Sequence, residues 1–591
     1  MEKLTYYLEN ELAGAFEAAG YAAEYARVTV SNRPDLCEYQ CNGAMAAAKA
    51  YHKAPIAIAK DVLAHFPEED RKVVGRIEAV PPGFINFDVD PWYAAAYLAA
   101  AAEDEDLGIP QKEPETVVID YGGPNVAKPL HVGHLRSAVI GESIKRLGRA
   151  VGHNVIGDVH LGDWGLQMGL LITEMGERMP SLPYFDENFD GEYPEEAPFT
   201  IAMLEEMYPA ASARAKTDEE YHARALSATH ALQEGRRGYR ALWDKIMELS
   251  IRDLKANYEK LDVTFDLWKG ESDVQQYIPD MIAYLVENGY AHEDQGALVV
   301  DVAEEGDTKE IPPCIIRKSD GASLYATTDL ATILERVKLF DPDEMIYITD
   351  KRQEMHFTQV FRAARKSGLV YDGTKLRHLG FGTMNGKDGK PFKTRQGGVM
   401  RLEYLIADID AEMEKKIREN RNVREEDAAE TARIVGLAAL KYGDLSNQAT
   451  KDYVFDVDKF TSFEGNTGPY ILYTIVRIKS ILSRFAEEHP EENVTPDDLM
   501  GAASAAEKKL VLTASQFGWT AAEAFDTLAP HRLCQYVYET ANAFNTFYHE
   551  TKILSEEDPA RRRSYIALLT IVRRMMERAI DLLGFSAPEH M

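Results

Sequence analysis

One short stretch near residue 120 constrains the fold of this chain more than any other. Residues 116–120 form a β-branched, apolar run of the kind found inside a parallel sheet. A loop bounded by prolines follows at 121–130, and apolar residues return with helical spacing from Leu135 onward. The sequence therefore predicts a strand–loop–helix unit with two histidines at the start of the helix, in the segment His131-Val132-Gly133-His134.

This segment suits the binding of a nucleotide phosphate. A helix N-terminus carries unpaired N–H groups and roughly half a positive charge. His131 and His134 stand three residues apart on the first turn, so both imidazoles can donate to phosphate oxygens, and Gly133 lets backbone and ligand approach closely. Two such histidines alone are not specific, since histidines of a core or a surface also occur at this spacing.

A second segment far along the chain strengthens the nucleotide interpretation. Residues 386–398 contain four glycines and four cations, and they follow a strand-like run at 376–383. One interpretation is a solvated charged turn. The other is a flap that brings Lys393 onto the phosphates during reaction.

Together the two segments resemble the class I aminoacyl-tRNA synthetases. Their second motif is usually KMSK, and here Lys390-Pro391-Phe392-Lys393 stands in its place. The stretches at 124–136 and 386–395 closely resemble the arginyl-tRNA synthetase family, many members of which carry a GKPFKTR-like loop. Lys128 resembles the extra cation that such members use to compensate for the altered loop. Further matches lie at 162–169, 325–331 and 466–470.

The resemblance implies the ATP-dependent activation of L-arginine to arginyl-adenylate. The arginyl group then passes to the 3′ end of tRNA(Arg), giving arginyl-tRNA, AMP and pyrophosphate. ATP would enter with Mg²⁺ as a substrate complex, and arginine activation would require bound tRNA. The residues expected to catalyse the reaction are His131, His134, Lys128 and Lys393, and those expected to bind ATP are Gly133, His131, His134, Lys390 and Lys393.

Tyr325 and Asp329 are expected to recognise the arginine side chain. They are four residues apart, so on a helix they share one face. A carboxylate binds a guanidinium through two parallel charge-assisted hydrogen bonds, and a tyrosine hydroxyl adds orientation. Without the family resemblance, a helix cap with a core tyrosine is the simpler interpretation.

Four more residues complete the expected pocket. Asn125 and Gln167 resemble family positions that hold the amino and carboxylate ends of the substrate, although either could be an ordinary structural amide. His356 and Gln359 lie at the end of the sheet and are expected to line the pocket, with a structural role as the alternative for His356.

The fold class predicted is α/β, with a doubly wound parallel-sheet (Rossmann-like) catalytic domain that carries insertions. An N-terminal α+β add-on domain and a C-terminal α-helical bundle flank it. The expected boundaries are 1–112 for the add-on, 113–434 for the catalytic domain and 435–591 for the bundle, with insertions at about 175–250 and 285–322.

The flanking domains are expected to bind tRNA. By the resemblance, the add-on touches the tRNA elbow and the bundle binds the anticodon, where unpaired bases stack and form hydrogen bonds. The bundle residues expected to do so are Tyr538, Asn542, Phe547 and Lys552. Base rates make most of these residues core instead.

Composition sets the remaining expectations. The 591 residues carry a formal net charge of −31, so RNA contacts must come from restricted basic faces. The four cysteines include Cys37 and Cys41, which could share a helix face, but no CxxC-type pair exists and no bound zinc is expected. No apolar run approaches the roughly 18 residues of a membrane span. A cytoplasmic monomer without membrane contact is expected.

The sequence is compatible with two rival functions. A small-molecule adenylyltransferase shares the HxGH segment, but such chains are much shorter and lack a helical bundle. A catalytically inactive tRNA-binding relative would have damaged phosphate-binding positions, whereas His131, Gly133, His134, Lys128 and Lys393 are all present.

Overall fold

The computed structural model describes residues 2–33, 35–67, 73–128, 130–318, 324–390, 400–420 and 423–591. The chain divides into two compact units. The first consists of Met1–Pro110, Tyr473–Glu523 and Gln535–Ile580, and the second of Gln111–Leu472, Ala524–Cys534 and Asp581–Met591.

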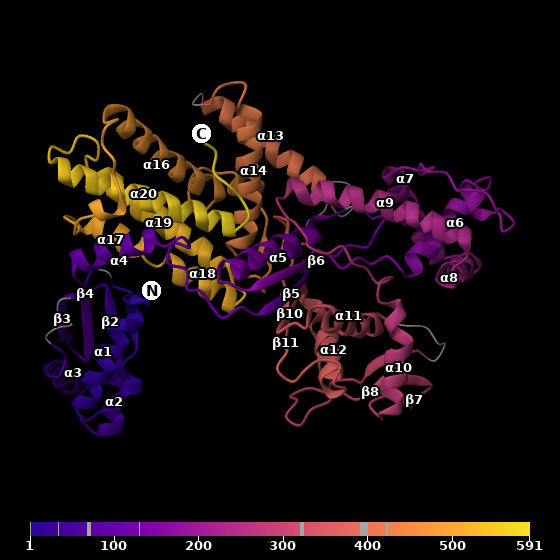
Figure 1. Cartoon of the computed structure of the whole chain (residues 1–591), viewed down its shortest axis with the longest axis horizontal. Helices are drawn as coiled ribbons and strands as arrows, with labels where there is room; N and C mark the ends of the chain where they lie inside the picture. The colour runs from indigo at the N-terminus through magenta and orange to yellow at the C-terminus, as the bar shows by residue number, and fades with distance from the viewer. Residues whose placement is uncertain are drawn as a thin grey trace. The chain divides into compact units, whose positions relative to one another are not determined.

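A four-stranded parallel sheet forms the centre of the second unit (Figure 1). The strand order is β11-β10-β5-β6, and every neighbouring pair is parallel. The sheet confirms the predicted α/β class. Its strands are β5 (Thr116–Tyr121), β6 (Asn154–Asp158), β10 (Glu344–Asp350) and β11 (Lys375–Phe381).

Successive side chains of a strand point to opposite faces of the sheet, and helices pack against both faces. Helix α5 (Val132–Ala150) contacts β5, β6 and β10. A Cβ on Gly141 would lie 2.2 Å from Cγ of Tyr121, so glycine is required where α5 crosses β5. Val118 of β5 instead joins a core with α11 (Tyr325–Phe340) and α12 (Glu354–Lys366).

Two further groups of elements interrupt the alternation of strands and helices. Within the expected insertion at 175–250 lie α7 (Ile201–Ala215), α8 (Glu219–Gln233) and part of α9 (Arg237–Lys260), which follow α6 (Leu166–Arg178). After α10 (Ile278–Glu287), a separate antiparallel sheet occupies the expected insertion at 285–322, built from β7 (His292–Asp294), β8 (Ala297–Val300) and β9 (Cys314–Arg317).

Shorter elements follow the parallel sheet in the second unit. Strand β12 (Met384–Asn385) pairs in parallel with β13 (Tyr453–Val454), and α15 (Val457–Phe460) follows β13. Helices α13 (Leu402–Asn420) and α14 (Ala428–Leu445) lie between them in sequence. The domain boundary expected at residue 435 falls inside α14, because the apolar helical pattern continues through that residue without a break.

The first unit combines an N-terminal α+β part with C-terminal helices. An antiparallel sheet of order β1-β2-β4-β3 is formed by Val28–Val30, Tyr39–Cys41, Val74–Val80 and Phe84–Val89 in order of strand number. Its helices are α1 (Leu4–Ala18), α2 (Gly43–Tyr51), α3 (Pro55–Ala64) and α4 (Pro91–Glu103). The C-terminal helices, some of which extend into the second unit, are α16 (Gly468–Glu488), α17 (Ala505–Ala514), α18 (Phe517–Asp526), α19 (Pro530–Glu550) and α20 (Pro559–Leu582).

The fold bears on two expectations drawn from composition, one about the cysteines and one about membrane spans. Cys41 ends strand β2, so Cys37 and Cys41 do not share a helix face, and all four cysteines are buried free thiols. Across the described residues, no helix has both the length and the apolar character needed to cross a membrane.

Candidate active site

The two histidines of the HxGH segment cap helix α5 reciprocally. The Nδ1 atom of His131 accepts from the Gly133 N–H at 3.0 Å, and Nδ1 of His134 accepts from the His131 N–H at 3.1 Å. The ring centroids lie 3.9 Å apart, with the planes inclined by 32°. The expectation that both imidazoles share one side of the first turn is confirmed.

This cap fixes the tautomer of both rings. Because each Nδ1 accepts a hydrogen bond, a neutral ring must carry its proton on Nε2. Desolvation and the neighbouring charge of Lys128 lower the pKa of His131, and desolvation, His131 and Lys128 lower that of His134 to about 3. Both histidines are therefore neutral near pH 7 and present an Nε2–H donor.

Gly133 serves this arrangement directly. A Cβ at this position would lie 2.7 Å from Cε1 and 2.9 Å from Nδ1 of His131. The space expected to admit a ligand is thus occupied by the ring of His131, and a larger residue would push that ring off its cap.

The residues that follow the basic loop lie beside the start of the same helix. On the C-terminal side of the loop, Arg401 forms an antiparallel bridge with His131. The Val132 N–H donates to the Met400 carbonyl at 3.2 Å, and the Leu402 N–H donates to the Leu130 carbonyl at 2.9 Å. Residues 400–402, which follow the basic loop, are therefore paired through their backbones with residues 130–132 of the HxGH segment.

The cations of the site fall into three groups. Lys128 places Nζ 4.3 Å from the ring centroid of Tyr208 on α7. Lys387 pairs with Asp456 and Asp458 at 3.0 Å each, and Lys390 is exposed on the turn that follows. Lys393 lies outside the described residues.

Asn125 and Gln167 come together around one backbone group. Asn125 forms a parallel bridge with Gly162, and the Gln167 side-chain amide donates to the Gly162 carbonyl. A Cβ on Gly162 would lie 2.1 Å from Oδ1 of Asn125. Both amides thus border the same loop, at the carboxyl ends of β5 and β6.

Of the residues expected to bind the arginine guanidinium, the structure brings some into direct contact and gives another a different partner. Tyr325 and Asp329 lie on the first two turns of α11, which confirms their shared helix. Asp329 accepts from Nε2 of His356 at 2.5 Å, so His356 is a direct partner of that carboxylate. Gln359 instead donates to the carbonyls of Pro312 and Pro313, at 2.8 and 3.1 Å.

Glu271, which the sequence did not reveal as a candidate, interacts electrostatically with both Asp329 and Tyr325. Burial raises its pKa to about 7; Asp163 and Asp329 add to the rise, and His160 opposes it. Partial desolvation of Tyr325 and the charge of Glu271 raise the pKa of the Tyr325 hydroxyl. Glu271 and Asp329 thus place two carboxylates near Tyr325, which is 72% exposed.

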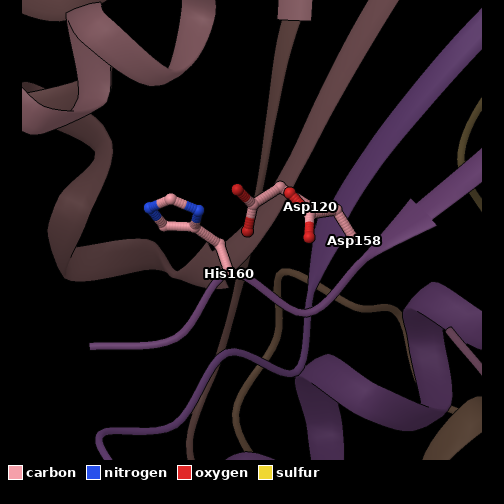
Figure 2. Close-up of side chains that lie close together, drawn as sticks. All are labelled: Asp120, Asp158 and His160. Atoms are coloured by element: carbon pink, nitrogen blue, oxygen red, sulfur yellow. The ribbon is translucent and has the colours of Figure 1, made fainter. Parts of the chain in front are cut away.

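One cluster resembles a metal site. Asp120, Asp158 and His160 offer ligand atoms within 4.8 Å of one another, and Figure 2 shows the two carboxylates close together beside the imidazole. However, Nη2 of Arg336 donates to Oδ2 of Asp120 at 2.6 Å and to Oδ2 of Asp158 at 2.7 Å. A buried guanidinium already supplies the positive charge, so the cluster does not suit a resident divalent ion.

The expected tRNA-binding residues of α19 do not share one environment. Phe547 is fully buried, and its ring packs against Tyr565 at 5.4 Å between centroids. An unpaired base cannot reach this ring, so the prediction that it contacts tRNA is wrong and Phe547 is a core residue. Tyr538 and Asn542 are partly exposed, and Lys552, just beyond the helix, is exposed.

Comparisons with known proteins agree with this geometry. Residues 98–457 match the model of the class I tRNA synthetase (R) catalytic domain, residues 471–591 the DALR anticodon-binding domain, and residues 2–89 the arginyl-tRNA synthetase N-terminal domain. The arginine–tRNA ligase of Agathobacter rectalis is 59% identical and that of Alkaliphilus oremlandii 55% identical, each over 100% of both chains.

Solved structures share the fold over the whole chain. The arginyl-tRNA synthetase of Plasmodium falciparum superposes with a TM-score of 0.81 and covers 100% of this chain and 99% of its own, at 24% identity. That of Thermus thermophilus gives 0.79 over 100% of both chains, also at 24% identity. This chain belongs to the arginyl-tRNA synthetases, the class I arginine–tRNA ligases.

Proposed function

We propose that the enzyme activates L-arginine with Mg²⁺–ATP at the carboxyl edge of the parallel sheet and then charges tRNA(Arg). The observation that carries this assignment is the pairing of residues 400–402 with residues 130–132. This pairing sets the end of the basic loop against the capped helix N-terminus, where a phosphate is best stabilised.

The phosphate-binding groups act as donors with fixed geometry. The Nε2–H groups of His131 and His134 face developing negative charge without carrying a charge themselves, while Lys128, Lys390 and Lys393 neutralise the phosphates. Preorganised donors of this kind stabilise a transition state without reorganising during the reaction. Gly133 keeps the His131 ring in place.

The arginine-binding groups provide complementary charge and shape. Asp329 and Glu271 would share the substrate guanidinium, and the Tyr325 hydroxyl would orient it. Asn125 and Gln167 would hold the amino and carboxylate ends. His356 fixes the Asp329 carboxylate, and Gln359 fixes the wall formed by residues 312–313, so both act behind the contact surface.

The reaction then needs positioning more than side-chain chemistry. A carboxylate oxygen of arginine bonds to the α-phosphorus of ATP, and the bond to pyrophosphate breaks. The terminal ribose hydroxyl of tRNA next attacks the arginyl carbonyl, AMP leaves, and the hydroxyl proton is released. No side chain of the chain becomes covalently modified.

The remaining assignments concern the whole chain. We keep the division into an add-on at 1–112, a catalytic domain at 113–434 and an anticodon-binding bundle at 435–591 as a proposal. Tyr538, Asn542 and Lys552 are proposed to contact the tRNA. A cytoplasmic monomer that binds tRNA(Arg), arginine and ATP, without a structural zinc ion, completes the proposal.

The test is aminoacylation of tRNA(Arg) against a panel of amino acids, with two loop variants. Lys393→Ala should lower the rate of adenylate formation about a hundredfold, because it removes a phosphate partner. Lys387→Ala should lower it less than about threefold, since its ion pairs with the half-buried Asp456 and the exposed Asp458 indicate an anchoring role. Charging with another amino acid in preference to arginine, or equal losses in the two variants, would contradict the proposal.

A further inference from the structure

Helix α7 of the insertion presents two side chains to the active site from one face. Glu205 and Tyr208 are three residues apart, so they lie side by side on the helix. Oε2 of Glu205 is 2.8 Å from Nη1 of Arg401, whose backbone pairs with His131. The Tyr208 ring faces Nζ of Lys128 at 4.3 Å from its centroid.

The position of the Tyr208 ring is set by the insertion itself. Tyr208 packs against a small core formed by α6, α7 and α8, whose buried members are Leu170, Ala211, Tyr221 and Ala225. This packing restrains one side of the Tyr208 ring, while its partly exposed face is available to the flexible side chain of Lys128.

The backbone that carries Lys128 is held by the same insertion. Ala127 has a φ of 59°, in the left-handed region that alanine seldom adopts. Its N–H donates to Oγ of Ser250 on α9 at 3.1 Å. The insertion thus restrains Lys128 twice, at its backbone through α9 and at its ammonium group through α7.

We propose that Tyr208 is a positioning residue that sets the reach of the Lys128 ammonium group for the phosphates of ATP. This inference rests on the proposed role of Lys128. An ammonium on a four-carbon stem samples many rotamers, and contact with an aromatic face restricts them while leaving the charge intact. The phosphate-binding site is thereby coupled to the placement of the insertion helices.

The experiment is a double-mutant cycle on adenylate formation, measured with saturating tRNA(Arg). Tyr208→Leu removes the aromatic face and should lower the rate constant about fivefold to tenfold, with the arginine KM changed less than about twofold. Tyr208→Phe keeps the face and should restore most of that loss. In a Lys128→Met background, Tyr208→Leu should change the rate less than about twofold, because the group it positions is gone.

Tyr239→Leu provides the matched control. Tyr239 lies in α9 of the same insertion. The guanidinium carbon of Arg236 lies 4.0 Å from the centroid of its ring, so Tyr239→Leu loses a cation–π contact that does not involve Lys128. Its rate should equal that of the unaltered enzyme, and its thermal midpoint shows the stability cost of such a loss.

Two results would overturn the inference, and they differ in meaning. Equal effects of Tyr208→Leu with and without Lys128 would show that Tyr208 acts independently, while Lys128 keeps its role. A Lys128→Met variant with an unchanged rate would refute the phosphate role of Lys128, and with it the reason for positioning that residue.

Discussion

The backbone N–H of His131 donates to Nδ1 of His134 at 3.1 Å. This bond closes one half of the cap on α5 and commits His134 to the tautomer with its proton on Nε2. Nδ1 of His134 therefore caps the helix, and Nε2–H on the other side of the ring remains available as a donor to a ligand. The same division applies to His131, whose Nδ1 accepts from Gly133.

His134→Ala should lower the rate of arginine activation roughly a hundredfold, while tRNA affinity stays nearly unchanged. The donor acts on charge that develops in the transition state, and losing one costs about 3 kcal/mol. Pre-steady-state measurement of adenylate formation, with a separate tRNA-binding titration, checks both parts. A normal rate in this variant would exclude the phosphate role.

His134→Asn separates capping from catalysis. The asparagine oxygen can replace Nδ1 as acceptor for the His131 N–H, but no donor then occupies the place of Nε2. This variant should unfold at a higher temperature than His134→Ala and be as slow. Recovery of the rate together with stability would mean that His134 only caps the helix.

Asp329→Asn should raise the arginine KM at least about tenfold, with the KM values for ATP and tRNA little changed. The amide keeps the size of the side chain but loses the anion, and a hydrogen bond to a charged group contributes roughly 1.5–3 kcal/mol. Discrimination against citrulline should weaken in steady-state kinetics, because the unpaired carboxylate that rejects it is gone.

The control for this variant comes from the partner of Asp329. His356→Gln retains a donor near the position of Nε2, so its arginine KM should rise less than about threefold. If Asp329→Asn spares arginine binding and weakens ATP binding instead, Asp329 belongs to the nucleotide site.

We expect Glu271 to make arginine binding dependent on pH. Its pKa of about 7 exceeds the usual carboxyl value, chiefly because of burial, so the carboxylate is half protonated near neutrality. A guanidinium binds the ionised form. The arginine KM should therefore fall as the pH rises from about 6 to about 8 and then level off.

Kinetics of Glu271→Gln test this assignment. The variant should have a higher arginine KM that no longer falls across that range, while the ATP KM follows the unaltered enzyme. A slope that persists in Glu271→Gln would show that Glu271 is not the group responsible for the pH dependence.

The spacing of apolar residues along the chain correctly predicted the main strands and helices of the catalytic sheet. The strand at 116–120 and the helix with His131 at its start followed from periodicity, and so did the parallel sheet. The sequence did not indicate a role for Glu271. Its segment is held in place by isolated long-range bridges, such as that between Leu161 and Gly270, and such bridges leave no periodic pattern in the sequence. No sequence pattern indicated that Glu271 interacts with the expected arginine-binding residues.

The error at Phe547 had a visible cause. The buried residues Val537, Thr540 and Phe544 precede it on one stripe of α19, with successive steps of three, four and three residues up to Phe547. That spacing predicts a core position. The assignment as a tRNA contact followed residue type and family resemblance instead of helical phase.

Arg336→Ala should be rescued by guanidinium. The substitution leaves the buried Asp158 and the largely buried Asp120 without their shared cation, a loss of about 3–5 kcal/mol, and should lower the thermal midpoint on the order of 5–10 °C. The vacated space matches a guanidinium in charge and in planar shape. Millimolar guanidinium chloride should therefore raise the midpoint of Arg336→Ala, whereas an equal concentration of tetramethylammonium chloride should not. In the unaltered enzyme neither salt should raise it, because Arg336 fills the site. If Mg²⁺ but not guanidinium stabilises the variant, then the cluster with His160 is a latent metal site and its selectivity for a guanidinium is refuted.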